Sequence, residues 1–171
     1  MLGFILIHGD AVLDFPEGSA FYNPDGPETV ATTIRQALEE SEAEFQNRVY
    51  KNIYDEYFRL TGSGLSHKET VTELKSSNDD PTAEIVTEIT YEYPLTSKQL
   101  QEAVATQDEW LKHFVPEAIM AYYIKILHIK QNRLTKEIAT ATPERQREII
   151  PEIGMIHNQI KAIRNKMGKQ K

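Results

Sequence analysis

The last third of the chain carries the clearest pattern of apolar and polar positions. Apolar residues recur there in steps of four and three, the spacing of a heptad seam, which predicts two amphipathic helices. The members of the two stripes are Met120, Ile124, Leu127, Leu134 and Ile138, with Gln131 in the missing position, and then Ile149, Ile153, Ile156, Ile160, Ile163 and Met167.

The segment from Thr140 to Pro143 separates these stripes and has the composition of a turn. We therefore expect two long helices folded back on each other as an antiparallel hairpin. The register of this hairpin stays open. Folding the chain at the midpoint between the stripes pairs different residues across the two helices than folding it at a tight turn centred on residue 141. Pro151 lies inside the second stripe and lacks a backbone N–H, so we expect a kink or a break near Ile150.

The opening segment is ambiguous. Phe4 to Ile7 is a short apolar run followed by His-Gly-Asp, which suits either the first strand of an α/β enzyme or a buried helix that ends near Gly9. No repeated strand, Gly-rich loop and helix follow it, so the helix is favoured. Pro16 to Gly26 then contains three turn signals and predicts a loop.

Three further blocks have helical spacing. Val30 to Leu38 predicts one amphipathic helix, and Phe45 to Leu60 predicts a second with an unusually aromatic face, which we interpret as core packing. Ser66 followed by Glu69 has the pattern of a capping box and predicts a short helix through Leu74.

The next predicted helix starts with Asp80 as its cap and Pro81 at its first position. The sequence IVTEITYEYP that follows alternates locally like a strand, but a lone strand leaves its backbone unpaired. We therefore expect the helix to continue to about Thr90, with an extended exit to Pro94. Another helix is predicted from Ser97 to Leu111, and the hairpin is predicted to begin at Pro116.

Charge divides the chain at the same place. Residues 1–116 carry 8 lysines and arginines against 21 acids, a net charge of −13, whereas residues 117–171 carry 11 against 5, a net charge of +6. Such asymmetry predicts two parts with different surfaces. The expected architecture is all-α, with a compact acidic helical bundle over residues 1–115 followed by a basic antiparallel helical hairpin over residues 116–171.

The sequence offers little for catalysis. It has no cysteine, which excludes disulfides, cysteine-ligated clusters and cysteine nucleophiles. None of the five histidines has a metal-ligand spacing, and no nucleotide-binding or hydrolase motif occurs. We therefore expect a domain that is not an enzyme and that carries no catalytic residue, metal or cofactor. No apolar run approaches the roughly 18 residues of a membrane span and no signal peptide is evident, so a cytoplasmic protein is expected.

The final helix is the best candidate for binding, because basic side chains flank its apolar stripe. A membrane partner is disfavoured by the lack of a bulky aromatic at the tail, and nucleic acid by the acidity of the rest of the chain. A protein partner is preferred, although a basic helix end also complements the helix dipole. The candidate partner-binding residues are Ile156, Ile160, Lys161, Ile163, Arg164, Lys166, Met167, Lys169 and Lys171.

Five features of the chain resemble one known family in their order and spacing. They are FILIHGDAVLDF, VATTIRQALEE, FQNRVYKNIYDEYFRL, DPTAEIVTEITYEYPLTSK and the closing pair of long helices. Together they are similar to the C-terminal, helicase-binding domain of bacterial DnaG primase, in the form found in Bacteroidetes. The segment from Tyr93 to Ser97 matches a Tyr-x-Leu-Ser-like element of that domain.

This resemblance implies a helical bundle followed by a hairpin, without polymerase activity of its own. It also implies a partner: the hairpin would dock on the N-terminal collar of the hexameric replicative helicase, DnaB, and tether primer synthesis to the replication fork. The alternative from another class is a self-associating helical scaffold, such as a phage-type assembly protein, whose C-terminal helices form a coiled coil.

Overall fold

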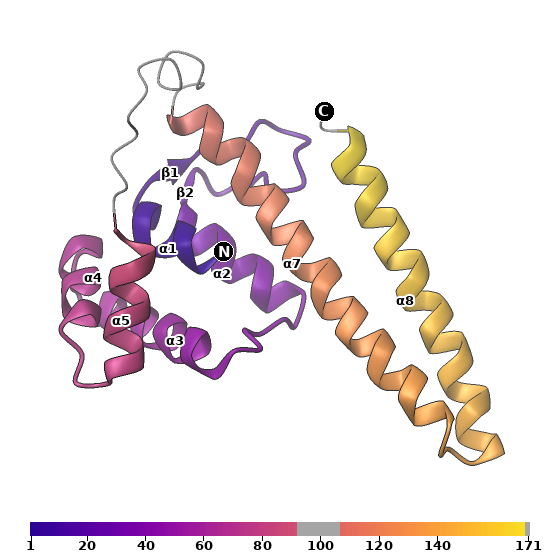
Figure 1. Ribbon diagram of the computed structural model, residues 1–171. Coiled ribbons are helices and arrows are strands. Elements are labelled where there is room, and N and C mark those ends of the chain that lie inside the picture. The colour runs from indigo at the N-terminus through magenta and orange to yellow at the C-terminus, as the bar shows by residue number, and fades with distance from the viewer. Residues whose placement is uncertain (92–106, 170–171) are drawn as a thin grey trace, which may run out of the picture. The chain divides into compact units, whose positions relative to one another are not determined.

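The computed structural model describes residues 1–91 and 107–169, which form seven helices and one very small sheet (Figure 1). The structure is 72% helical, which confirms the expected all-α class. Its contacts divide the chain into two compact units, Met1–Pro116 and Glu117–Lys171.

The first unit contains all of the shorter elements. Its helices are α1 (Leu2–His8), α2 (Val30–Glu40), α3 (Arg48–Gly62), α4 (His67–Lys75), α5 (Asp80–Ile89) and the beginning of α7 (Gln107–Ile138), and its strands are β1 (Val12–Leu13) and β2 (Glu28–Thr29). The two strands are antiparallel, with Val12 opposite Thr29. The sequence interpretation contained no strand pair, because two residues are too few to show an alternating pattern.

The ambiguous opening segment is a helix, as favoured from the sequence. Leu2, Ile5 and Leu6 on α1 are buried. The chain then turns sharply, and the first two N–H groups of α2 donate back across the turn. Val30 N donates to the carbonyl of Ala11 at 2.9 Å, and Ala31 N donates to the carbonyl of Gly9 at 3.1 Å. These bonds satisfy amides that a helix start otherwise leaves unpaired.

The aromatic block forms packed ring contacts, as predicted. Tyr54 lies 4.8 Å from Phe58 and 5.4 Å from Phe45 between ring centroids. Phe45 itself precedes the helix, because α3 begins at Arg48 behind the cap residue Asn47. The side chain of Asn47 accepts hydrogen bonds from two backbone amides of the first turn, which places the start three residues later than the apolar pattern indicates.

Asn47→Ala is expected to lower the free energy of unfolding by about 1 kcal/mol, because it removes this cap. Chemical denaturation followed by helical circular dichroism measures the change. Asn52→Ala is the matched control, since Asn52 is exposed in the middle of the same helix. If the two variants are equally stable, the cap contributes nothing and this account of the helix start is wrong.

The next two helices begin with different caps. The capping box at the start of α4 is present, with Ser66 and Glu69 bonded to each other's backbone. At α5 the cap is Asp79 and not Asp80, so the helix starts one residue earlier than expected. It ends at Ile89, close to the predicted Thr90. The predicted exit to Pro94 and the predicted helix start at Ser97 lie outside the described residues.

The expected helix boundary at Pro116 is wrong, because α7 runs through this proline without interruption. A proline inside a helix costs about 3 kcal/mol. Leu111 and Val115, on the turns before it, are 1% and 0% exposed, and burial of such side chains contributes about 1.5 to 3 kcal/mol each. Packing of the flanking residues therefore outweighs the lost backbone bond.

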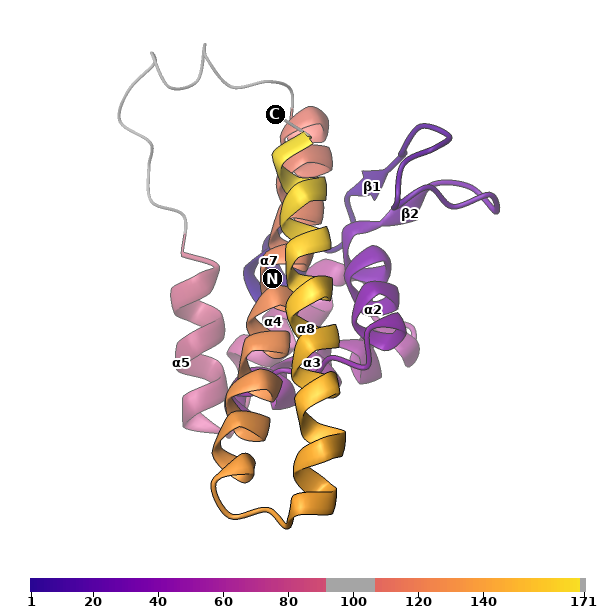
Figure 2. The same cartoon turned by 90° about the vertical axis from the view of Figure 1, so that its right-hand side faces the viewer.

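The second unit is an antiparallel pair of helices formed by the later part of α7 and by α8 (Pro143–Lys169), as Figure 2 shows. The expected break near Ile150 does not occur, since α8 is one helix with Pro151 inside it. The buried residues Ile149 and Ile156 lie on either side of this proline. Both halves of α8 are thus held against α7, which keeps the helix intact.

Candidate protein-interaction face

The hairpin is held together by the apolar seam that the heptad spacing predicts. Its core consists of Leu127, Leu134, Ile149, Ile156 and Ile160, all at most 5% exposed. Partly buried neighbours from both stripes, including Ile124, Ile138, Ile153 and Ile163, pack against this core. The seam is therefore occupied by the hairpin's own side chains.

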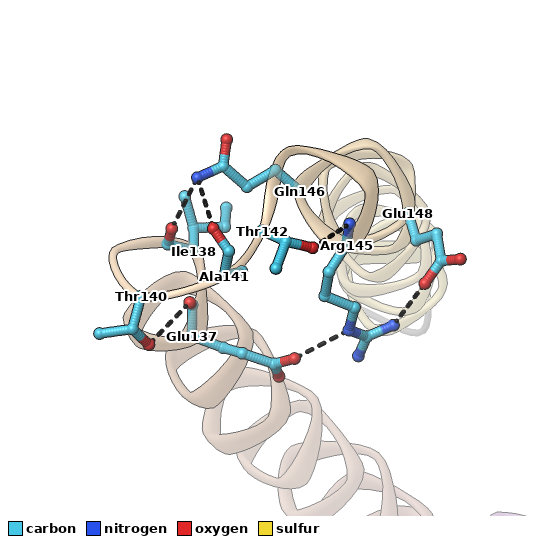
Figure 3. Close-up of polar contacts among 8 residues, drawn as sticks. All are labelled: Glu137, Ile138, Thr140, Ala141, Thr142, Arg145, Gln146 and Glu148. Carbon is cyan, nitrogen blue, oxygen red and sulfur yellow. Dashed lines mark hydrogen bonds and ion pairs between the residues drawn. The ribbon is translucent and has the colours of Figure 1, made fainter.

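A polar network closes the tip between the two helices (Figure 3). Gln146 donates its amide N–H groups to the carbonyls of Ile138 and Ala141 at 3.1 and 3.2 Å, which satisfies one acceptor at the end of α7 and one in the turn. Thr142 precedes Pro143, the first residue of α8, and its hydroxyl accepts from Arg145 N at 3.4 Å. The turn therefore consists of only four residues, 139–142.

Two ion pairs resolve the register that the sequence left open. Arg145 Nε donates to Glu137 on α7 at 2.8 Å, and Lys130 Nζ lies 3.0 Å from Glu152 on α8. Each pair is equidistant from residue 141 in the chain, as expected for the tight turn. The same Arg145 also contacts Glu148 at 3.0 Å, and these bonds raise the pKa of its guanidinium above the ordinary value.

The predicted partner-binding residues fall into two groups in the structure. Ile156 and Ile160 are 3% and 4% exposed and belong to the seam, while Ile163 and Met167 are half-buried. Lys161, Arg164 and Lys166 are exposed, and Arg164 contacts the ring of His128 at 3.3 Å between nitrogens. The side chain of Lys169 and the whole of Lys171 lie outside the described residues.

The outward surface of α8 carries apolar residues that the heptad pattern does not include. Ile150 and Met155 are each 61% exposed, and Pro151 and Gly154 beside them are also exposed. Spacings of three and four residues place these four positions next to one another on the helix. We call Ile150, Pro151, Gly154 and Met155 the outer patch.

The two acids nearest to the outer patch are already paired, Glu148 with Arg145 and Glu152 with Lys130, each at 3.0 Å. Arg147 lies one turn before it, and Lys161 and Lys166 follow it on exposed positions. From Ile153 to Met167 the sequence of α8 contains no acid. The face therefore offers exposed apolar side chains next to positive charge, which suits a partner with apolar and acidic groups.

The outer patch was not predicted from the sequence, because the prediction considered only the apolar residues at heptad positions. Ile150 and Met155 are apolar residues off the heptad positions of a helix that is otherwise polar on that side. Their departure from the heptad pattern was the one sign of this patch in the sequence. Whether the two side chains are exposed depends on which side of α8 packs against α7.

The described ranges contain neither a candidate metal site nor a candidate membrane span. No group of three or more histidines, aspartates and glutamates there is arranged to hold a metal ion. None of the helices in the same ranges combines the length and the apolar character that a membrane span requires.

Comparison with known proteins identifies a family for this chain. A family model described as "Domain of unknown function (DUF8430)" matches residues 1–170. Neither the curated proteins nor the solved structures contain a match to the chain.

Proposed function

The chain belongs to the DUF8430 family, and we propose that it is a non-catalytic protein-interaction domain of a DNA primase. In this proposal its helical hairpin docks on the N-terminal collar of the hexameric replicative helicase. The domain thereby holds primer synthesis at the replication fork.

One observation supports docking more than any other: the outer patch leaves two large apolar side chains in water. Ile150 and Met155 are each 61% exposed on a helix whose seam is already filled. Burying such a side chain contributes about 1.5 to 3 kcal/mol, so the patch can supply apolar anchors without opening the hairpin. The basic residues beside it would orient an acidic partner surface.

The identity of the partner rests on the sequence resemblance to the helicase-binding domain of DnaG primase. The blocks that carry this resemblance extend from Phe4 to the closing helices. A tether of this kind acts by raising the local concentration of primase at newly unwound single strand, and it needs no catalytic group in the tethering domain.

The test is co-elution of the chain with the cognate hexameric helicase in size-exclusion chromatography. The wild-type chain is expected to move into the hexamer fraction. The double variant Ile150→Ser, Met155→Ser is expected to bind more than about tenfold more weakly, because it removes both anchors.

Ile7→Ser is the matched control, since Ile7 is 49% exposed but lies on α1 in the first unit. It should bind the helicase like the wild type. Failure of the wild-type chain to co-elute would contradict the proposed partner. Normal binding by the double variant would contradict the proposed docking face.

Self-association as a scaffold is the alternative function. The exposed apolar side chains of the outer patch are equally available to a second copy of the chain. Light scattering of the chain alone separates the two possibilities, because a defined oligomer without helicase would favour the scaffold.

A further inference from the structure

A pocket of about 560 Å³ opens in the first unit, at the point where the chain turns from α1 towards α2. Its wall includes Gly9 and Asp10 from the turn, Arg35 from α2, Tyr57 from α3 and His67 from α4. Several of these residues are polar, and the bonds among them determine which groups remain available to a ligand.

The buried hydroxyl of Tyr57 contacts His67. The tyrosine is 2% exposed, and its Oη lies 2.9 Å from Nδ1 of His67. Burial, and secondly the carboxylate of Asp10, raise the pKa of Tyr57 to about 12, so the phenol keeps its proton. Since Nδ1 is the acceptor that the described residues offer to this hydroxyl, a neutral His67 carries its own proton on Nε2.

Among the described residues, no hydrogen-bond acceptor lies close to Nε2 of His67. The nearest carboxylate oxygen, Oδ1 of Asp10, is 3.9 Å away, which is too long for a hydrogen bond. The side chain of His67 is 14% exposed, and its Nε2 is open to the pocket and not fully buried. A ligand acceptor in the pocket would satisfy this group.

Arg35 supplies a second set of donors. Its Nε donates to Glu39 at 2.8 Å, and its guanidinium carbon lies 5.2 Å from the ring centroid of Phe58. Its two terminal nitrogens have no hydrogen-bond partner within the described part of the chain. The side chain of Arg35 is 51% exposed, so its terminal nitrogens are open to a ligand carboxylate, and the contacts with Glu39 and Phe58 favour one position of the guanidinium without fixing it.

Asp10 supplies the opposite charge at the rim. Its side chain is 71% exposed, and the long contact to His67 is the one ion pair that it forms with the described residues. Apart from the histidine, the charged groups of the wall are Asp10, Glu39 and Arg35, a net charge of −1. This balance opposes a phosphate, and an apolar ligand would leave the polar groups unpaired.

A ligand that carries both charges fits these groups. We propose that this pocket binds a small zwitterion, an amino acid or a short peptide, with its carboxylate at Arg35 and His67 and its ammonium group at Asp10. This binding site is independent of the proposed docking of the hairpin, because every residue that forms it lies in the first unit.

The test is a titration of the full chain, followed by amide NMR shifts, with four probes: alanine, dialanine, N-acetyl-dialanine and dialanine amide. Alanine and dialanine distinguish a free amino acid from a peptide as the ligand. The two capped probes each lack one charge and are expected to bind about tenfold more weakly than dialanine, the scale of one charge-assisted hydrogen bond.

Substitutions at two exposed residues test which side chain binds each end of the ligand. Arg35→Gln should lower the affinity for dialanine about tenfold, so that dialanine binds no more tightly than dialanine amide. Asp10→Asn should make dialanine bind no more tightly than N-acetyl-dialanine. Lys51→Gln is the control, because Lys51 forms a comparable exposed pair with Asp55 on α3 outside this pocket.

Saturable shifts centred on Gly9, Thr61 and His67, with these losses, would support the proposal. It is overturned if neither alanine nor dialanine gives saturable shifts there up to about 10 mM, a concentration that fills a millimolar site. It is also overturned if the capped probes bind as well as dialanine. Co-elution with helicase is unaffected by either result, so the two proposals fail separately.

Discussion

Ile149→Ala is expected to destabilise the hairpin by about 2 to 5 kcal/mol, whereas Ile150→Ala should change its stability by less than about 0.5 kcal/mol. The two residues are neighbours in sequence and identical in chemistry, but Ile149 is 0% exposed in the seam and Ile150 is 61% exposed. Truncation at the seam leaves a cavity between α7 and α8. Truncation on the outer patch removes a side chain that contacts mainly water.

Hydrogen exchange of α8 amides under native conditions measures this difference, because it reports the opening of the hairpin by itself. The amides near Ile156 should exchange much faster in Ile149→Ala than in the wild type, and at the wild-type rate in Ile150→Ala. Similar exchange in both variants would mean that the seam does not hold the hairpin together. The same result would also contradict the distinction between buried positions such as Ile149 and docking positions such as Ile150.

Gly9→Ala is expected to destabilise the first unit by about 1 to 3 kcal/mol. A Cβ at this position would overlap the carbonyl oxygen of Ile5 and the hydroxyl of Tyr57, and it would lie 3.0 Å from Nδ1 of His67. The backbone of Gly9 is ordinary, with φ at −58°, so the cost comes from space and not from conformation. The bond between Tyr57 and His67 would have to shift to admit the methyl group.

Gly62→Ala is the matched control for this variant. Gly62 ends α3, and a Cβ there meets nothing within 4 Å. Alanine at that site should be neutral or stabilising by up to about 1 kcal/mol, because it lowers the entropy of the unfolded chain.

The fluorescence of Trp110 in a denaturant titration reports the first unit in both variants, since this single tryptophan packs against Phe4 at 5.6 Å between ring centroids. Equal midpoints for the two variants would contradict the tight packing at Gly9.

Local patterns in the sequence were sufficient to predict most of the helices. The capping box of Ser66 and Glu69 marks the start of α4, and the seam from Leu127 to Ile160 follows heptad spacing. These features depend on residues close in the chain, so their physics is visible in the sequence. The prolines were misleading for the same reason: the local cost of Pro116 and Pro151 is real, but burial of their neighbours exceeds it.

The sequence by itself determined the all-α class, the two helices of the hairpin and the residues of their common seam, because periodicity encodes which side of a helix is apolar. Only the tertiary structure decided the register, through the pairing of Glu137 with Arg145, and the exposure of Ile150 and Met155. It alone also brought Asp10, Arg35 and His67 around one pocket. These features depend on distances between residues far apart in the chain, and no local pattern records such distances.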